Sequence, residues 1–256
     1  MESKGNENWE LHGDCLNIIG ELRTEEIDDI LKLPFIRVIQ PWKFMPNEKT
    51  WLELNEKVFS MKPEIQLHIW ADTISSDFIF LSKMSHVRHL KLNQVKFRDL
   101  ETLGHLKQLK SLVLINGNVS YLKFLGQLKE LEILEIGRIR GIQELSFISE
   151  LPILKSLNIS NQAQVEALPD FTLNKELKSI QLFTLKNLVD VSNLSKLEKL
   201  EELVFHDLST ALSPEQFSFL KEFKHLKNVK FHFNTKEKNN LFKQIINEVL
   251  GSETGS

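Results

Sequence analysis

The sequence has very little cysteine, since Cys15 is the only one in 256 residues. A single cysteine excludes an intramolecular disulfide and fits a reducing compartment. Long apolar runs are also missing, because no stretch approaches the roughly 20 residues of a membrane-spanning helix. The polar first residues, MESKGNENWE, contain no apolar segment of signal-peptide length. We therefore expect a cytoplasmic protein that does not bind a membrane.

An excess of charge of either sign is missing as well. The 32 Lys and Arg residues nearly balance the 35 Asp and Glu residues, which gives a formal net charge of -3. Such a balance does not favour nucleic acid or an anionic membrane as the partner. Basic residues recur at the second position of the repeat described below, but Glu132 and Glu201 interrupt them. A nucleic-acid groove needs a denser basic stripe with stacking aromatics, so we expect no nucleic-acid binding.

Sequence motifs of catalysis are missing too. The chain has no glycine-rich phosphate loop, no G-x-S-x-G and no H-E-x-x-H. Cys15 has no nucleophile motif around it, and we interpret it as a buried cysteine. Two histidine pairs, His68 with His89 and His206 with His232, could begin a metal site, but a closed zinc site needs four ligands. We expect no enzymatic activity, no cofactor and no metal centre.

What the sequence does contain is a repeat with the pattern apolar-x-x-apolar-x-apolar. The step of two is typical of a strand, whereas the steps of three that follow are typical of a short 3₁₀ or helical return segment. Leu112 and Leu114 are therefore predicted to point inward, as are Leu134 and Ile136 in the next unit. A single coil cannot bury its apolar row alone, so the coils must stack into a solenoid. The units begin at Glu64, Val87, Leu109, Leu131, Leu154, Leu177, Leu200 and Leu226.

This pattern resembles the leucine-rich repeat proteins, in particular the short repeats of bacterial internalin-like and phosphatase-regulatory proteins. The resemblance covers roughly residues 64–231 and implies an α/β solenoid with a curved parallel sheet on its concave face and short 3₁₀ or helical segments on its convex face. The family usually has Asn or Cys at the ninth position of each unit, where it bonds the turn backbone. The turns of this sequence must satisfy their backbone groups by other means. Its ninth positions hold Val95, Gly117, Ile139, Gln162, Leu185 and Leu208.

The front of the repeat region is predicted to be capped, because a solenoid exposes its core at its ends. Residues 24–33 and 49–59 have the patterns of helices, and residues 35–39 have the pattern of a strand. We interpret residues 9–63 as irregular early repeats that form this cap, preceded by a disordered segment over residues 1–8.

The back of the region is predicted to be capped by a helix. The repeats proper extend over residues 64–233, and residues 234–250 then show a helical apolar period. Residues 251–256 read as a disordered tail. The inward face of the capping helix is predicted to consist of Leu241, Ile245, Ile246 and Val249.

Side chains at the third, fifth and seventh positions of each unit should point out of the sheet on the concave face. Several of them are apolar, and large apolar groups beside polar ones often mark a contact site. The alternative is that β-branched residues simply suit strands, or that a loop covers them. We predict that the partner-binding residues are Trp70, His68, His89, Lys91, Val113, Ile115, Ile133, Glu135, Phe183, Val204 and His206.

The function that the sequence favours is non-catalytic binding of a protein partner by a monomer. Because the repeats and caps account for the chain, we expect a stand-alone binder such as an inhibitor or an immunity-type protein. Two alternatives remain open. A secreted or surface-attached host-binding protein of the internalin type would need an export signal, and an enzyme with an unrecognised site would need a convergent polar pocket.

Overall fold

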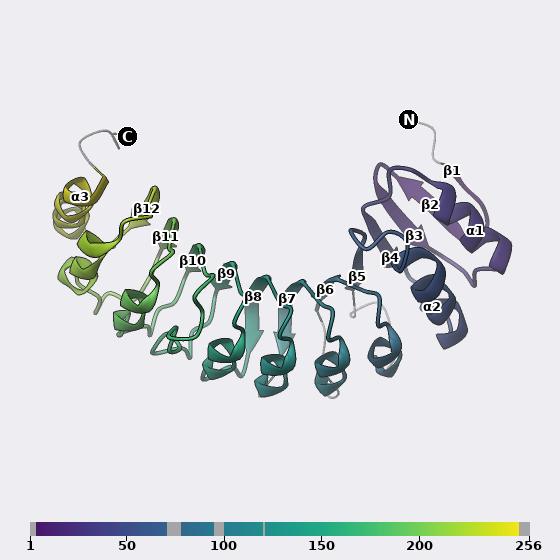
Figure 1. Ribbon diagram of the computed structural model, residues 1–256, viewed down its shortest axis with the longest axis horizontal. Coiled ribbons are helices and arrows are strands. Elements are labelled where there is room, and N and C mark those ends of the chain that lie inside the picture. Colours follow the sequence, from purple (N-terminus) through teal and green to yellow (C-terminus); the bar gives the residue numbers. More distant parts are fainter. Residues whose placement is uncertain (1–3, 71–77, 95–99, 120, 251–256) are drawn as a thin grey trace. The chain divides into compact units, whose positions relative to one another are not determined.

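The computed structural model describes residues 4–70, 78–94, 100–119 and 121–250. The chain divides into two compact units, Met1–Asn118 and Val119–Ser256. Within each unit the strands follow one another across the sheet in chain order. Figure 1 shows strands along one side of each unit and short helical segments along the other. This arrangement confirms the predicted solenoid of strands and helical returns.

The described residues of the first unit form seven strands. The first three pair antiparallel, and from β3 to β7 neighbouring strands pair in parallel. The strands are β1 Lys4–Gly5, β2 Trp9–His12, β3 Cys15–Ile18, β4 Val38–Pro41, β5 Gln66–Trp70, β6 His89–Asn93 and β7 Ser111–Asn118.

The helical segments of the first unit connect these strands. The α-helices are α1 and α2, and α2 continues directly into a π-helical turn. Two 3₁₀ helices follow at later coils. The bounds are α1 Thr24–Lys32, α2 Glu48–Leu54, the π turn Asn55–Phe59, and the 3₁₀ helices Ile79–Lys83 and Leu100–His105.

In the second unit, residues 119 and 121–250 form five strands, which pair in parallel from β8 to β12. Residues 161–178, all of them described, form no helix between β9 and β10. The strands are β8 Ile133–Arg140, β9 Ser156–Ser160, β10 Ser179–Phe183, β11 Glu202–His206 and β12 Asn228–His232. The helical segments are Lys123–Gln127, Ser146–Glu150, Ser192–Lys196 and Pro214–Glu222, all 3₁₀, and the α-helix α3 Lys236–Leu250.

Equivalent repeat positions face each other across neighbouring strands. Ser156 of β9 pairs with Ser179 of β10, which in turn pairs with Glu202 of β11. In the first unit, His89 pairs with Ser111 in the same way. The strands thus stay in register, and differences in repeat length are accommodated in the segments outside them.

The inward rows form the core. Leu112, Leu114, Leu134 and Ile136 are fully buried, which confirms the predicted inward direction of these side chains. Burying one such side chain stabilises a fold by about 1.5–3 kcal/mol. The apolar row, repeated from coil to coil, is therefore the main source of stability in each unit.

The eighth position of six repeats is in the left-handed backbone region; it directly follows β6, β9, β10 and β11 and lies within the longer β7 and β8. This conformation is unusual for residues other than Gly, Asn and Asp. It lets the chain leave the sheet while the amide still bonds to the next coil, as in the Asn161 N–H donated to the Phe183 carbonyl oxygen at 2.8 Å. The φ angles are 58° at Gln94, 57° at Asn116, 52° at Arg138, 55° at Asn161, 55° at Thr184 and 60° at Asp207.

Asparagines elsewhere in the coil replace part of the missing ninth-position ladder. The buried Asn174 side chain donates to the carbonyl oxygens of Ile148 at 2.9 Å and Leu151 at 2.8 Å. Asn193 donates to the Leu168 carbonyl oxygen at 3.0 Å. These side chains satisfy backbone acceptors of the preceding coil, as the sequence required of some group. Val95, the first of the ninth positions, lies outside the described residues.

At the front of the chain, the structure confirms helices near both predicted positions. The predicted strand at residues 35–39 begins later, at Val38. The antiparallel hairpin formed by β2 and β3 was not predicted. Residues 4 and 5, in the range expected to be disordered, pair with β2 as a short strand.

A buried carboxylate organises this front segment. Glu26 of α1 accepts hydrogen bonds from the Asn6 side chain at 2.6 Å and from the Arg23 backbone N–H at 2.8 Å. Asn8 donates a further bond at 3.1 Å. Burial by itself would raise the pKa of Glu26, but the hydrogen bonds from Arg23 and Asn8 outweigh it and hold the pKa below its ordinary value.

At the other end, α3 covers the last coil with one correction to its inward face. Ile245 and Ile246 are buried as predicted, whereas Leu241 is exposed and Phe242 takes the fully buried position. Positions 242, 245, 246 and 249 have the spacing of one helical face, and position 241 lies beside it. The Phe242 ring packs 4.4 Å from that of Phe231, between centroids.

Candidate functional site

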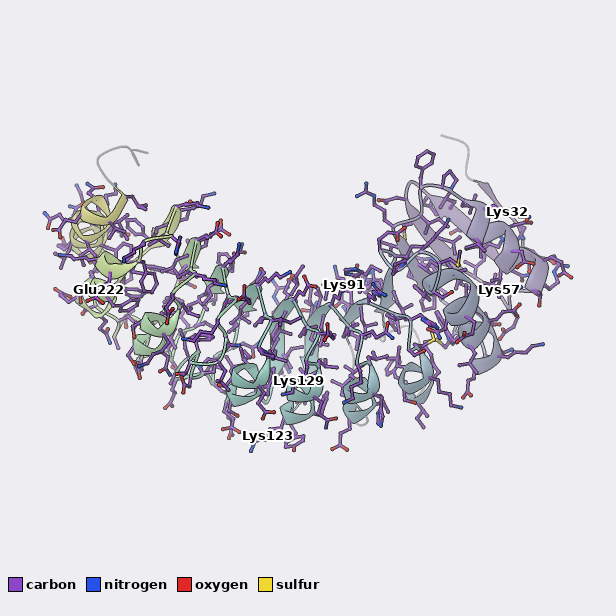
Figure 2. All side chains as sticks on the ribbon, in the orientation of Figure 1. Lys32, Lys57, Lys91, Lys123, Lys129 and Glu222 are labelled. Atoms are coloured by element: carbon purple, nitrogen blue, oxygen red, sulfur yellow. The ribbon has the colours of Figure 1, made fainter. Side chains whose placement is uncertain are left out.

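The concave face of each unit consists of the side chains at the third, fifth and seventh repeat positions. In the first unit the pairings bring Gln66 beside His89, His68 beside Lys91, and Trp70 beside Asn93. The next strand adds Val113 beside Lys91 and Ile115 beside Asn93. Figure 2 labels Lys91, which belongs to β6 on this surface. The predicted residues of the first unit therefore share one sheet surface.

His68 is the most perturbed group on that surface. Its ring lies 5.5 Å from the Trp70 ring, between centroids. Burial, followed by the positive charge of Lys91, lowers the pKa of His68 to about 4. The imidazole is therefore neutral at physiological pH, and its buried Nε2 atom has no hydrogen-bond partner. Because this atom is buried, it is not accessible to a partner in this structure.

Trp42 belongs to the same surface and was missed from the sequence. It directly follows β4, and Lys43 after it has a φ of 55°, as the eighth position does elsewhere. Trp42 thus occupies a seventh position, and 42% of its surface is exposed. The signal was the segment IRVIQP from Ile36, in which Pro41 stands where the pattern has an apolar residue.

Not every outward-facing side chain is accessible to a partner, as Asn93 shows. It lies on the concave face but is buried, because the Asn116 side chain donates to its Oδ1 atom at 2.9 Å. Val113 and Ile115 are half-buried. Among the outward residues named for the first unit, Trp42 is exposed, whereas His68, Trp70, Val113 and Ile115 are half-buried.

The second unit presents its own apolar group on the concave face. Ile133 of β8 is 44% exposed, and Glu135 lies two residues farther along the same strand. Phe183 of β10 and Val204 of β11 are half-buried. Because Phe183 pairs with His206 and Gln181 pairs with Val204, Phe183 and Val204 are diagonal neighbours.

Polar residues that are fixed by hydrogen bonds or ring stacking lie beside Phe183 and Val204. Glu202 accepts a hydrogen bond from Ser179 Oγ at 2.7 Å and another from the Asn228 side chain at 2.7 Å. The bond from Ser179 lowers the pKa of Glu202. The exposed rings of His206 and His232 stack with 4.7 Å between centroids. A fixed carboxylate and a stacked imidazole pair thus flank the two apolar side chains.

The basic residues at the second repeat position are engaged in ion pairs in this unit. Glu201 lies 3.0 Å from Lys178 and 2.6 Å from Lys227, and these hydrogen bonds, with that of Lys227 the stronger, lower the pKa of Glu201 to about 2. Lys155 lies 2.7 Å from Glu132. These lysines form an alternating ladder with carboxylates and not a free basic stripe.

Groups with catalytic potential are sparse among the described residues. No set of three or more His, Cys, Asp or Glu side chains in that part of the chain is placed to hold a metal ion. Cys15, predicted to be buried, is half-buried on β3. Its burial, followed by the charge of Asp14, raises the pKa of the thiol, which makes it a poor nucleophile.

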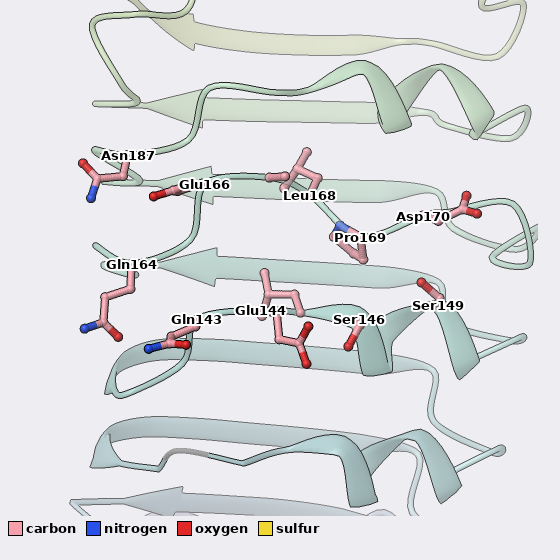
Figure 3. A pocket seen from close by; sticks show the side chains of 12 residues that line it. Gln143, Glu144, Ser146, Ser149, Gln164, Glu166, Leu168, Pro169, Asp170 and Asn187 are labelled. Atoms are coloured by element: carbon pink, nitrogen blue, oxygen red, sulfur yellow. The ribbon is translucent and has the colours of Figure 1, made fainter.

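Hollows occur on a different surface of the second unit. One of about 720 Å³ is lined by residues from the segments before and after β9, and Figure 3 shows Gln143, Gln164 and Asn187 on successive coils. A second of about 430 Å³ includes Arg138 and Arg140. Gln164 lines both. These hollows were not predicted from the sequence.

No protein-family model and no curated protein matches the sequence. Solved structures match it at low identity. The internalin InlF of Listeria monocytogenes has 16% identity and a TM-score of 0.52 over 82% of this chain and 64% of its own. The leucine-rich repeat domain of the type III effector XopL has 14% identity and a TM-score of 0.54 over 81% of this chain and 80% of its own. Toll, in the Drosophila Toll–Spatzle complex, has 13% identity and a TM-score of 0.59 over 88% of this chain and 35% of its own.

These similarities establish the fold, which is that of a leucine-rich repeat solenoid. The chain spans less than two thirds of the length of InlF. Within the described residues, no helix combines the length and the apolar composition needed to cross a membrane.

Proposed function

We propose that this protein is a non-catalytic module that binds another protein on the concave face of its sheet. The observation that carries the proposal is the exposure of large apolar side chains at outward strand positions, with Ile133 at 44% and Trp42 at 42%. Trp side chains are enriched among residues that dominate binding energy, and fixed polar groups around apolar anchors are typical of interfaces.

The proposed contact residues of the first unit are those predicted from the sequence, together with Trp42. Aromatic rings supply a large contact area at a low cost in side-chain entropy. The neutral His68, whose ring lies against that of Trp70, is a half-buried part of the same surface. In the second unit Phe183 and Val204 are the proposed anchors, and Glu202 and His206 form the rim.

The fold is compatible with this use. The Toll–Spatzle structure is a complex in which a protein of the same fold is held with a second protein. For this chain, we propose a monomeric binder that works alone, in the manner of an inhibitor or an immunity-type protein. A host-binding protein of the internalin type is the alternative, and the shared fold with InlF is the observation that favours it.

The test is a pair of charge insertions, Phe183→Glu and Trp70→Glu, one in each unit. An outward side chain contributes little to stability, so circular dichroism and thermal melting should show an intact fold. If either residue is an anchor, the partner captured from the native cell should bind at least about 30-fold more weakly, because an unpaired charge would be buried in the contact.

The matched control is Leu173→Glu. Leu173 is also a large apolar residue of the second unit, with 64% of its surface exposed, but it lies outside the strands. Its replacement should leave binding unchanged, measured by calorimetry with the captured partner. Unchanged binding by both Phe183→Glu and Trp70→Glu, with the fold intact, would show that the working surface lies elsewhere.

A further inference from the structure

The hollow beside the end of β8 has two arginines in its lining. Arg138 and Arg140 are both exposed, and Gly141, Asn161 and Gln164 also line the space of about 430 Å³. β8 has eight residues, whereas β9, β10, β11 and β12 have five each. The extension carries both arginines on paired backbone, and the Arg140 carbonyl oxygen accepts a bond from the Val119 N–H at 2.8 Å. A site built on a strand is more precisely positioned than one on a loop.

These arginines differ from the other cations of the neighbouring coils. Lys155, Lys178 and Lys199 each pair with a carboxylate within 3.0 Å. Neither Arg138 nor Arg140 has an ion pair or a side-chain hydrogen bond within the described part of the chain. They are also the only arginines of the second unit. Arginine presents a planar fork of donors that matches a carboxylate, so an unpaired pair at a hollow is suited to an anionic ligand group.

The adjoining hollow of about 720 Å³ carries the opposite charge. Glu144, which lies 3.6 Å from Lys123, lines it together with Glu166 and Asp170, and Gln164 joins it to the arginine hollow. In Figure 3, Gln164 lies between Gln143 and Asn187, while Glu144 and Asp170 lie farther from the strand ends. Asp170 already accepts bonds from Thr172, at 2.6 Å from its hydroxyl, whereas no side-chain partner of Glu166 is found in the described residues. The missing helix between β9 and β10 leaves this space open.

We propose that the two hollows together dock an extended segment of a protein partner, in which a short acidic stretch is followed by basic residues. The acidic residues would pair with Arg138 and Arg140, and the basic ones would reach the carboxylates around Glu166. The carboxylates limit the length of the acidic stretch, because a longer one would be repelled. The chain has a net charge of -3, so a general attraction for anions does not account for binding here. This surface is separate from the residues proposed on the concave face and does not depend on them.

The test uses synthetic peptides as probes, titrated into the whole protein while backbone amide shifts are followed by NMR at low ionic strength. The block peptide has two glutamates at one end and two lysines at the other, separated by glycine and serine. Its isomer has the same composition with alternating charges, and a neutral version has glutamine at all four positions. We expect shifts around residues 138–141 and 161–170, with the block peptide binding at least about tenfold more tightly than the neutral one. The isomer should bind several-fold more weakly than the block peptide.

Substitutions separate this site from a general charge effect. Arg138→Gln combined with Arg140→Gln should reduce the affinity for the block peptide to that of the neutral peptide. The matched control combines Lys224→Gln with Lys243→Gln, which removes the same charge from exposed positions outside the hollows. It should leave the affinity unchanged, as should Phe183→Glu on the concave face.

The proposal is overturned if the arginine variant binds the block peptide as tightly as the unmodified protein does, or if the neutral peptide binds equally well. Equal affinity for the block peptide and its isomer would overturn the proposed order of charges. Because the peptides are measured without the native partner, loss of concave-face binding in Phe183→Glu and loss of peptide binding in the arginine variant are independent results.

Discussion

Leu134 and Ile133 are adjacent on β8, and their replacement by alanine should have very different effects on stability. Leu134 is fully buried and pairs with Leu157 of the next strand, whereas Ile133 is 44% exposed. Leu134→Ala removes three carbon groups, which at about 0.8 kcal/mol per buried group amounts to about 2.4 kcal/mol of lost transfer free energy. The cavity that remains adds to this loss, so we expect about 2.5–5 kcal/mol in total.

For Ile133→Ala we expect less than about 1 kcal/mol, because an exposed strand residue loses mainly its local strand preference. Urea denaturation followed by far-UV circular dichroism gives both values through linear extrapolation. The slope of the transition should match that of the unmodified protein, so that the midpoint reports stability alone. Comparable losses for the two variants, or a larger loss for Ile133→Ala, would refute the assignment of inward and outward rows.

Three further predictions concern the ends, the titration of the concave face and the turns. Deleting residues 237–256 should make the protein aggregate, measured by light scattering, because it uncovers the phenylalanine core beneath α3; deleting residues 251–256 alone should have no effect. The depressed pKa of His68, about 4, means that the unfolded chain binds its proton first as the pH falls. Stability should therefore decrease from about pH 6.5, the ordinary value, down to about pH 4, and His68→Gln should remove that part of the dependence in urea unfolding at several pH values. Thr184, a β-branched residue with a φ of 55°, is strained, so Thr184→Asn should stabilise the second unit by about 0.5–1 kcal/mol in thermal or urea unfolding. Asn161→Thr at the equivalent position should destabilise it by a similar amount, and the same sign for both changes would contradict the strain argument.

The repeat and its core could be predicted because geometry alone fixes them. The alternation within a strand and the threefold steps of the return segment place Leu112, Leu114, Leu134 and Ile136 on one side regardless of the partner or the turn type. The C-terminal helix was predicted for the same reason. Its inward face shifted by one residue, from Leu241 to Phe242, since two neighbouring apolar residues leave the helical phase ambiguous.

The front of the chain was predicted less completely, because its residues do not follow the repeat pattern that its strands nevertheless continue. Pro41 stands where the repeat has an apolar residue, so the coil that contains Trp42 was interpreted only as an irregular early repeat, without a register that placed Trp42 outward. The β2–β3 hairpin has no repeat period at all, and its position depends on tertiary contacts, among them those of Glu26 with Asn6 and Asn8. Propensity alone does not encode such a network.

For the candidate site, the direction in which each side chain points could be predicted, but its exposure could not. The repeat register indicates which side chains face outward, yet Asn93 is buried because Asn116 of the next coil bonds to it, and Ile133 is more exposed than Ile115. The hollows were not predictable, because they are formed by the segments that connect the strands, among them residues 161–178, which form no helix. The repeat period in the sequence does not indicate that this segment forms no helix.

Recognition and stability are thus assigned to different repeat positions, and the left-handed residue at the eighth position marks the boundary between them. Before it, inward leucines fix the strand and leave the third, fifth and seventh side chains free to vary in chemistry, as the differences between Trp70 and Phe183 show. After it, the chain leaves the sheet at β9, β10 and β11, whereas β8 continues to Arg140, so the rim depends on how each coil returns. At Arg138 the boundary residue itself lines a hollow. A substitution there should therefore affect both the turn and the rim, which is why glutamine, which keeps a long polar side chain at that φ angle, is a better probe of its charge than alanine or a β-branched residue.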